Sequence, residues 1–327
     1  MNVSNNLLDY QAALQGAAFF QQPDAGYLRI GGPDQADFLQ RQTTNDIRRL
    51  APGQALLTVL TSPTARILDV FHLLQEPETI GVITLPGRGA STARFLKSRI
   101  FFMDKVTVKD ASAEFTQIDV MGPQVADRLR PLGINPTPGI DRVVSFLVGD
   151  SAVRVLGLNP ANGLGCRLLA PAAEGAALSA RLVEQGISPL KPESYELLRV
   201  EAGLPGAGSE LNEAYTPLET GLEAAISSGK GCFTGQEVIA RQVTYDKVTQ
   251  HLCGLRLEND VKPGDNVWGE ERAVGAITSA VHSPRLGPIG LAILKRPYHQ
   301  PGTAVTVGER DGANITGVVS GLPFQAL

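Results

Sequence analysis

The sequence predicts an α+β fold followed by a small C-terminal β-barrel, and three observations lead to this prediction. Up to about residue 247, β-rich and helical segments alternate irregularly. Several of the links between them are short enough for β-hairpins, which favours α+β over a doubly wound parallel sheet. Beyond residue 247 only short β-rich segments remain, separated by Gly, Pro and Asp turns, as is typical of a small barrel.

Residues 1–247 are expected to form one domain of two subdomains, and residues 248–327 a second, barrel domain. Helices are indicated by apolar residues at helical spacing or by proline at a first-turn position. They are expected at 1–22, from 33 onward, and at 90–99, 122–132, 171–185 and 193–202. Strands are expected at 27–30, 55–61, 66–74, 79–85, 106–108, 115–120, 143–147 and 153–158. Five barrel strands are expected at 251–257, 274–281, 289–294, 304–307 and 315–319.

Composition and charge argue against several classes of protein. The 35 Gly and 22 Pro among 327 residues are too few for a low-complexity chain, and a net charge of −4 is unusual for a nucleic-acid binder. No apolar run is long enough for a membrane span, and the first residues do not resemble a secretory signal. Three cysteines cannot form a disulfide framework, and the four histidines are too isolated for a metal site. A cytoplasmic protein with reduced thiols is expected.

The segment KGCFTGQEVIAR carries the most specific chemical signal. Thr234 and Glu237 have the spacing of a helix capping box, which predicts a helix beginning at Gly235. Cys232 would then lie two residues before the cap, where free N–H groups and the helix dipole favour a thiolate. Lys230 adds a nearby positive charge. Cys232 is therefore a candidate reactive thiol, and the alternative is a small apolar residue buried in a loop.

Residues 88–109 form the most basic segment, with six basic side chains, one acidic side chain and a net charge of +5. Such a segment could bind RNA phosphates or a polyglutamate tail, with Phe95, Phe101 and Phe102 as stacking platforms. The alternative is an amphipathic helix with Ala93, Leu96 and Ile100 packed inward and the cations in water. The chain's negative net charge makes RNA binding the weakest of the functional hypotheses.

Residues 191–230 carry the opposite charge, with seven acidic and three basic side chains and a net charge of −4. Glutamates in this segment could accept hydrogen bonds from an amine-bearing heterocycle. The alternative is a solvated acidic surface with no ligand.

Three segments occurring in this order, LLRVEAGLP, TPLETGL and KGCFTGQEVIAR, resemble the YgfZ family of folate-binding proteins. This family belongs to the larger glycine-cleavage T-protein, or aminomethyltransferase, superfamily. A Gly-Pro-Asp-x-x-x-Phe-Leu segment at 32–39 and the segment at 274–294 are similar to its N-terminal and C-terminal signatures. The resemblance covers nearly the whole chain.

The resemblance implies two interleaved folate-binding subdomains, a C-terminal barrel and a central channel for tetrahydrofolate. It also implies a role in the assembly or repair of iron–sulfur proteins, which would be the partners, and indirect support of tRNA modification. In this family the cysteine of the K-G-C motif is the functional residue, and here it is Cys232. The folate-binding residues that the resemblance implies are Arg199, Glu201, Glu219, Lys230, Gln236, Glu237 and Arg241.

Two departures from the superfamily pattern bear on catalysis. Aminomethyltransferases carry two consecutive acidic residues in the second hairpin region, of which the second engages folate, and the matching pair here is Asp69-Val70. They also place a glutamate against the pterin where this sequence has Arg167. Without the second carboxylate, no obvious group steers the attacking amine. The sequence therefore favours a folate-binding accessory factor, and the alternative is an aminomethyltransferase or folate demethylase.

Overall fold

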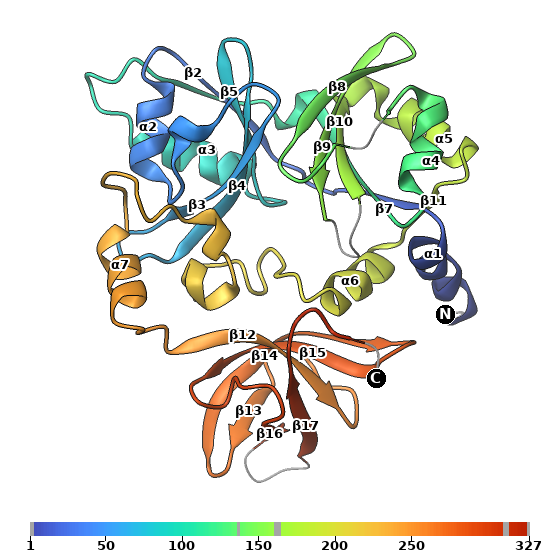
Figure 1. The fold of residues 1–327 in the computed structure, drawn as a ribbon, viewed down its shortest axis with the longest axis vertical. Coiled ribbons are helices and arrows are strands. Elements are labelled where there is room, and N and C mark those ends of the chain that lie inside the picture. Colours follow the sequence, from blue (N-terminus) through green and yellow to red (C-terminus); the bar gives the residue numbers. More distant parts are fainter. Residues whose placement is uncertain (1–2, 136–137, 160–164, 310–313, 326–327) are drawn as a thin grey trace. The chain divides into compact units, whose positions relative to one another are not determined.

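The computed structural model describes residues 3–135, 138–159, 165–309 and 314–325 (Figure 1). The chain divides into two compact units. The first consists of Met1–Ser194 and Ala224–Gln236, and the second of Tyr195–Glu223 and Glu237–Leu327. The chain therefore leaves the first unit and returns to it before entering the barrel.

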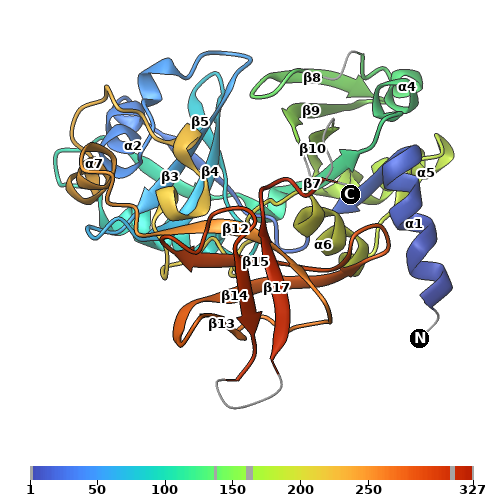
Figure 2. The same cartoon turned by 60° about the horizontal axis from the view of Figure 1, so that its bottom comes forward.

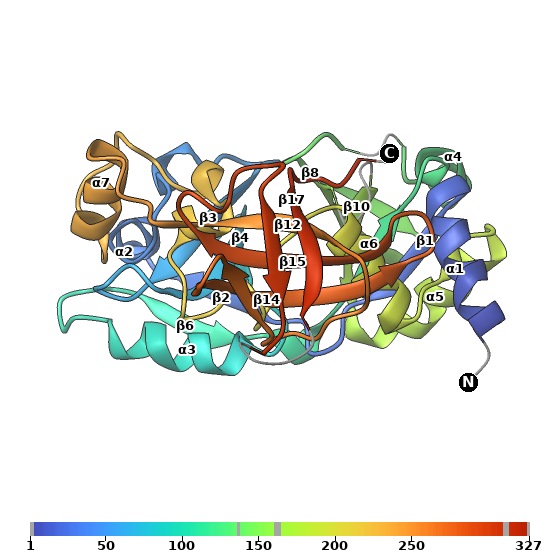
Figure 3. The same ribbon diagram turned by 90° about the horizontal axis from the view of Figure 1, so that it is seen from below.

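The first unit contains a five-stranded antiparallel sheet with the order β3-β4-β5-β2-β6. Its strands are β2 (Tyr27–Gly31), β3 (Ala55–Thr61), β4 (Ile67–Gln75), β5 (Thr79–Ile83) and β6 (Thr107–Asp110). The helices of this half are α2 (Gln35–Gln42), α3 (Gly89–Ser98) and the short η1 (Ile47–Arg49). Leu39 of α2 and Leu96 of α3 pack with Phe71 of β4 in one buried cluster. Figure 3 shows α3 running beside β6.

A six-stranded sheet with the order β11-β1-β7-β10-β9-β8 forms the other half of the first unit. Its strands are β1 (Ala18–Gln21), β7 (Phe115–Met121), β8 (Val143–Val148), β9 (Ser151–Leu158), β10 (Gly165–Pro171) and β11 (Ser188–Pro189). Its helices are α1 (Val3–Gln15), α4 (Val125–Leu129), α5 (Gly175–Glu184), η2 (Ser112–Glu114), η3 (Arg130–Leu132) and η4 (Ala172–Glu174). Leu129 of α4 and Leu182 of α5 pack against Ile118 and Leu168 of the sheet. Figure 2 shows both helices beside these strands.

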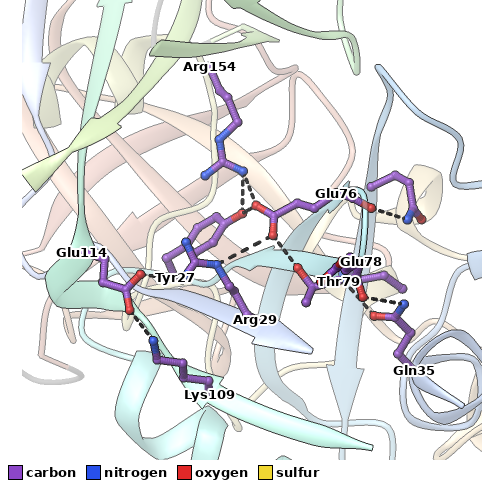
Figure 4. A network of polar contacts seen from close by, with 11 residues as sticks. Tyr27, Arg29, Gln35, Glu76, Glu78, Thr79, Lys109, Glu114 and Arg154 are labelled. Carbon is purple, nitrogen blue, oxygen red and sulfur yellow. Dashed lines mark hydrogen bonds and ion pairs between the residues drawn. The ribbon is translucent and has the colours of Figure 1, made fainter. Parts of the chain in front are cut away.

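The two sheets of the first unit share a buried cluster and a polar network. Tyr27 and Leu74 from the five-stranded sheet pack with Leu156 and Leu169 from the six-stranded sheet. Around this cluster, Glu76 accepts a hydrogen bond from the Tyr27 hydroxyl at 2.6 Å and forms an ion pair with Arg154 (Figure 4). The two sheets consequently form one compact unit.

The second unit is built on a closed barrel with the strand order β12-β15-β14-β13-β16-β17. Its strands are β12 (Gln250–Leu257), β13 (Asn266–Gly269), β14 (Arg272–Ser283), β15 (Gly287–Lys295), β16 (Ala304–Val307) and β17 (Ile315–Ser320). Before the barrel, this unit contains most of α6 (Pro192–Glu201), η5 (Pro217–Thr220) and most of α7 (Gln236–Thr244). The short η6 (Glu223–Ala225) lies where the chain returns to the first unit. Val200 of α6 packs with Ile289, Leu291 and Phe324 of this unit. The α+β class with a C-terminal barrel is confirmed.

Long-range strand pairing corrects several expected elements. The helix expected over residues 1–22 ends at Gln15, because residues 18–21 form β1 and pair with β7. Of the helix expected over 122–132, residues 125–129 form α4 and residues 130–132 continue as η3, whereas Gly122 has a φ of +122° and precedes the helix. The barrel has six described strands instead of the expected five. Sequence periodicity missed β13, a four-residue strand that contains Asn and Gly.

None of the helices within the described ranges is long and apolar enough to cross a membrane.

Candidate functional site

Cys232 is exposed, whereas the other two cysteines of the chain, Cys166 and Cys253, are buried. It lines a groove of about 510 Å³ in the first unit. The other lining residues are Arg41, Gln42, Ser98, Arg99, Ile100, Phe101, Phe233 and Thr234. Burial raises the pKa of both Cys166 and Cys253 to about 12. Cys232 therefore differs from the other thiols by being open to a reagent or a partner.

Lys230 anchors the loop that carries Cys232. Its Nζ donates to the carbonyl oxygens of Gln40, Thr43 and Asn45, at 2.8, 2.6 and 2.6 Å. Burial lowers the pKa of Lys230 to about 8, so the ammonium form still predominates at neutral pH and can donate all three hydrogen bonds. These contacts occupy the whole donor capacity of the side chain. The structure thus gives Lys230 a positioning role beside Cys232.

The turn after Cys232 is fixed by Gly235, and it corrects the expected start of the following helix. Gly235 has a φ of +84°, and a Cβ on this residue would lie 2.8 Å from the carbonyl oxygen of Ser62. The Thr61 hydroxyl also donates to the carbonyl oxygen of Thr234 at 2.6 Å. Because Gly235 has left-handed backbone geometry, α7 begins at Gln236 and not at Gly235.

Strand β4 places the Asp69-Val70 pair on its two opposite faces. Asp69 is fully buried, and its carboxylate accepts hydrogen bonds from the backbone N–H of Val70 and Leu85 and from the Thr92 hydroxyl in α3. Burial raises the pKa of Asp69 to about 6. Because side chains alternate along a strand, Val70 and His72 lie on the face away from α3. Asp69, the remaining acid of the pair, is therefore hydrogen-bonded on the side of β4 that faces α3, and the opposite side carries Val70 in place of a second acid.

The face of the first unit near His72 also contains a buried ion pair between β7 and β10. The Arg167 guanidinium contacts the Asp119 carboxylate in a two-pronged arrangement, at 2.6 and 2.9 Å. Gln22 donates to the same carboxylate at 2.6 Å. Burial and the positive charge of Arg167 lower the pKa of His72 to about 4, with Asp119 opposing them, so His72 is neutral at pH 7. A cleft of about 640 Å³ opens beside Gln22 and Gln117.

Three of the expected folate-binding residues lie in the second unit and make internal contacts there. Arg199 donates to Glu196, Glu210 and Ser279. Glu201 accepts from the Ser283 hydroxyl at 2.5 Å and from Arg285 at 2.7 Å. Glu219 completes a capping box with Thr216 at the start of η5. The contacts of Arg199 and Glu201 join α6 to the barrel, whereas the capping box of Glu219 is local to η5.

The remaining expected residues belong to α7. Gln236 is its first residue and lies in the first unit, whereas Glu237 and Arg241 lie in the second. Glu237 and Arg241 form an exposed ion pair at 3.8 Å, a type of contact that contributes little to stability. The two units therefore carry separate groups of the expected site residues, and Lys230, Cys232 and Gln236 form the group in the first unit.

Sequence reasoning missed two features of the site. His72 and Asp119 have no motif around them, and they meet only because β4 and β7 come together in the first unit. Arg41 in the groove wall likewise pairs with Asp104, 63 residues away. Within the described part of the chain, no group of three or more His, Cys, Asp or Glu side chains is arranged to hold a metal ion.

Comparison with protein families and named relatives supports an assignment over most of the chain. Residues 7–230 match the GCVT N-terminal domain, and residues 250–325 match the glycine cleavage T-protein C-terminal barrel domain. A chloroplastic protein of Arabidopsis thaliana, provisionally named a transferase, is 35% identical over 309 residues, which are 92% of this chain and 69% of that protein. The aminomethyltransferase of Pelodictyon phaeoclathratiforme is 27% identical over 330 residues, 97% of this chain and 90% of that protein.

A solved structure has the same fold. The glycine cleavage system aminomethyltransferase T from Bartonella henselae matches with a TM-score of 0.87, over 96% of this chain and 88% of that chain. The sequence identity in this comparison is 20%, so the likeness concerns the fold alone.

Proposed function

This chain belongs to the glycine cleavage T-protein family, and from this premise we propose that it is a YgfZ-type accessory factor that binds a reduced folate and supports iron–sulfur cluster assembly or repair through Cys232. The observation that carries the proposal is the groove that exposes Cys232 while the chain's other two thiols are buried. Support of tRNA modification would follow indirectly, through iron–sulfur enzymes that act on tRNA.

The folate part of the proposal rests on two features of the first unit, the neutral His72 near the Asp119–Arg167 pair and the cleft lined by Gln22 and Gln117. Reduced folates carry hydrogen-bond donors and acceptors on one heterocycle, which suits neutral amide and imidazole side chains. Because both oxygens of Asp119 contact Arg167, this carboxylate is not free to receive the pterin donors. We therefore expect weak binding, and bound folate would supply a one-carbon carrier.

The thiol part of the proposal rests on the exposure of Cys232. One thiolate can hold a single iron or sulfur atom transiently, whereas a stable cluster usually needs four protein ligands. The remaining ligands would come from the protein that receives or donates the cluster. The cluster is thus cargo for this protein and not a resident cofactor.

A tetrahydrofolate titration by calorimetry, with wild type and Cys232→Ala side by side, tests both parts. Equal binding by the two proteins is expected, because Cys232 lines a different groove from the cleft beside Gln22. Loss of activity of an iron–sulfur enzyme in cells is expected for Cys232→Ala only. Absence of heat and of any thermal shift in both proteins would exclude folate binding, and full complementation by Cys232→Ala would exclude the thiol mechanism.

Aminomethyl transfer is the second candidate, because relatives that are 27% identical over nearly the whole chain bear the name aminomethyltransferase. Val70 opposes this activity, since its side chain can neither carry charge nor accept a hydrogen bond. Wild type is expected to form no methylene-tetrahydrofolate from an aminomethyl donor. A gain of turnover in Val70→Asp but not in the uncharged control Val70→Asn would support this reasoning, and turnover by wild type would establish the second candidate.

A further inference from the structure

Three consecutive large apolar side chains project into solvent at the end of α3. The exposed fractions of Phe101, Phe102 and Met103 are 65%, 97% and 74%. Earlier residues of the same segment behave as an amphipathic helix, since Ala93 and Leu96 are buried in the core. The helix thus has a buried apolar face of its own, and residues 101–103 are apolar side chains that lie outside it. These three residues are called here the apolar tip.

The apolar tip is held in place by Asp104. Its carboxylate accepts a hydrogen bond from the backbone N–H of Phe101 at 3.0 Å and contacts the Arg41 guanidinium at 2.8 Å. The Asp104 N–H donates in turn to the Phe101 carbonyl oxygen at 2.9 Å. Because these contacts close the turn, the tip is presented to solvent in a defined conformation, which reduces the entropy lost on binding.

Positive charge without an acidic partner lies in the segment that carries the apolar tip, although Arg99 also stacks over the Phe95 ring. Arg94, Lys97, Arg99 and Lys105 are exposed, and none of them forms an ion pair with another residue in the ranges that the structure describes. Lys109 of the same segment is paired with Glu114, and Arg41 of α2 is paired with Asp104. The four unpaired cations make the surface around the tip complementary to an acidic partner.

The groove that contains Cys232 adjoins this surface. Ile100 and Phe101 line one part of it, and Phe233 lines it beside the thiol. Its volume of about 510 Å³ is sufficient for one or two side chains of a bound polypeptide. An occupant of the groove would therefore contact the apolar tip and Cys232 together.

We propose that the apolar tip, the four unpaired cations and the groove form a docking surface for an acidic polypeptide that inserts an apolar side chain beside Cys232. Phe, Met and Arg are the residue types enriched at the centres of protein interfaces. A concave groove suits a side chain better than a flat lipid surface, and the chain's net charge of −4 disfavours RNA. The proposal deepens the function proposed above, on which it rests, by giving the chemistry of the partner that reaches the thiol.

The test uses full-length protein and three fluorescein-labelled synthetic 12-residue peptides. One combines Glu with Phe and Leu, the second has Ser in place of Phe and Leu, and the third has Gln in place of Glu. Only the first is expected to bind and to protect Cys232 from iodoacetamide. Phe102→Ser and Arg99→Gln should each weaken binding roughly tenfold, as expected for an interface anchor. Leu147→Ser, which removes a 71% exposed side chain outside the groove, should leave binding unchanged.

Several outcomes would overturn the docking surface. These are no binding of the acidic apolar peptide, binding that Phe102→Ser and Arg99→Gln do not weaken, or binding without protection of Cys232. Preferential binding of a single-stranded RNA 12-mer or of phosphatidylserine vesicles would assign the surface to a different class of partner. Cys232→Ser should still bind the peptide, so a failure of the thiol mechanism in cells can be distinguished from a failure of docking.

Discussion

Asp69 and His72 lie three residues apart in β4, and their side chains face opposite sides of the strand. Asp69 accepts a hydrogen bond from the Thr92 hydroxyl of α3, whereas His72 interacts electrostatically with Arg167 and Asp119. Burial raises the pKa of Asp69 from 3.8 to about 6 and lowers that of His72 from 6.5 to about 4. Both side chains are therefore mostly uncharged in the folded protein near pH 5.

These two pKa shifts should have opposite effects on stability between pH 4 and 6.5. The stability that Asp69 contributes is present at low pH and is lost as the pH rises through 6, because its folded pKa is raised. The stability from neutral His72 is present above pH 6.5 and is lost as the pH falls through 4, because its folded pKa is lowered. In wild type the two contributions should largely cancel, so this pair should make the free energy of unfolding depend only weakly on pH.

Single substitutions should separate the two effects. In Asp69→Asn, the free energy of unfolding should rise between pH 4 and 6.5 by about 1–3 kcal/mol more than in wild type, because the opposing contribution of Asp69 is removed. In His72→Gln, the free energy of unfolding should instead fall with pH relative to wild type. Urea denaturation at half-unit steps from pH 4 to 7 would measure this. Parallel curves for the three proteins would show that neither group titrates as described.

The three thiols should react at very different rates. Cys232 should be alkylated first at pH 7.5, because it is exposed, whereas burial raises the pKa of Cys166 and Cys253 to about 12 and excludes the reagent. Iodoacetamide labelling followed by peptide mapping measures the order, and Cys232→Ser serves as the control without a fast phase. Early labelling of Cys166 or Cys253 in folded protein would contradict this interpretation.

Loss of the Lys230 ammonium should destabilise the first unit. Lys230→Met removes three hydrogen bonds to carbonyl oxygens and should lower the free energy of unfolding by about 2–3 kcal/mol. It should also change the alkylation rate of Cys232, whose loop it anchors. The matched control is Lys262→Met, in which an exposed lysine is replaced, and it should have almost no effect. Equal destabilisation by the two variants would argue against the anchoring role.

The ion pair of Glu76 and Arg154 should couple the two sheets of the first unit. Both side chains are largely buried, with exposed fractions of 16% and 19%, and Tyr27 shares the network (Figure 4). A double-mutant cycle with Glu76→Gln and Arg154→Met should give a coupling energy of about 1–2 kcal/mol in urea denaturation. The exposed pair Asp127 and Arg130 is the control and should give less than about 0.5 kcal/mol. A coupling no larger than the control would mean that the network does not join the sheets.

Local sequence determined the elements whose signals lie within a few residues. Apolar spacing predicted that Ala93 and Leu96 face inward, Pro192 marked the start of α6, and turn residues indicated the barrel. The K-G-C segment identified Cys232 as the cysteine to examine. These features depend on contacts between neighbouring residues along a helix or strand, which a short stretch of sequence specifies.

Tertiary structure alone decided how these residues are placed. The acceptors of Lys230 lie 185 to 190 residues away in the chain, Arg41 fixes the apolar tip through Asp104, and pairing with β7 makes residues 18–21 a strand. No periodicity or motif encodes such contacts, because they form only when packing brings distant segments together. Local patterns could therefore identify Cys232 as a candidate thiol, but its exposure is decided by how distant segments pack around it.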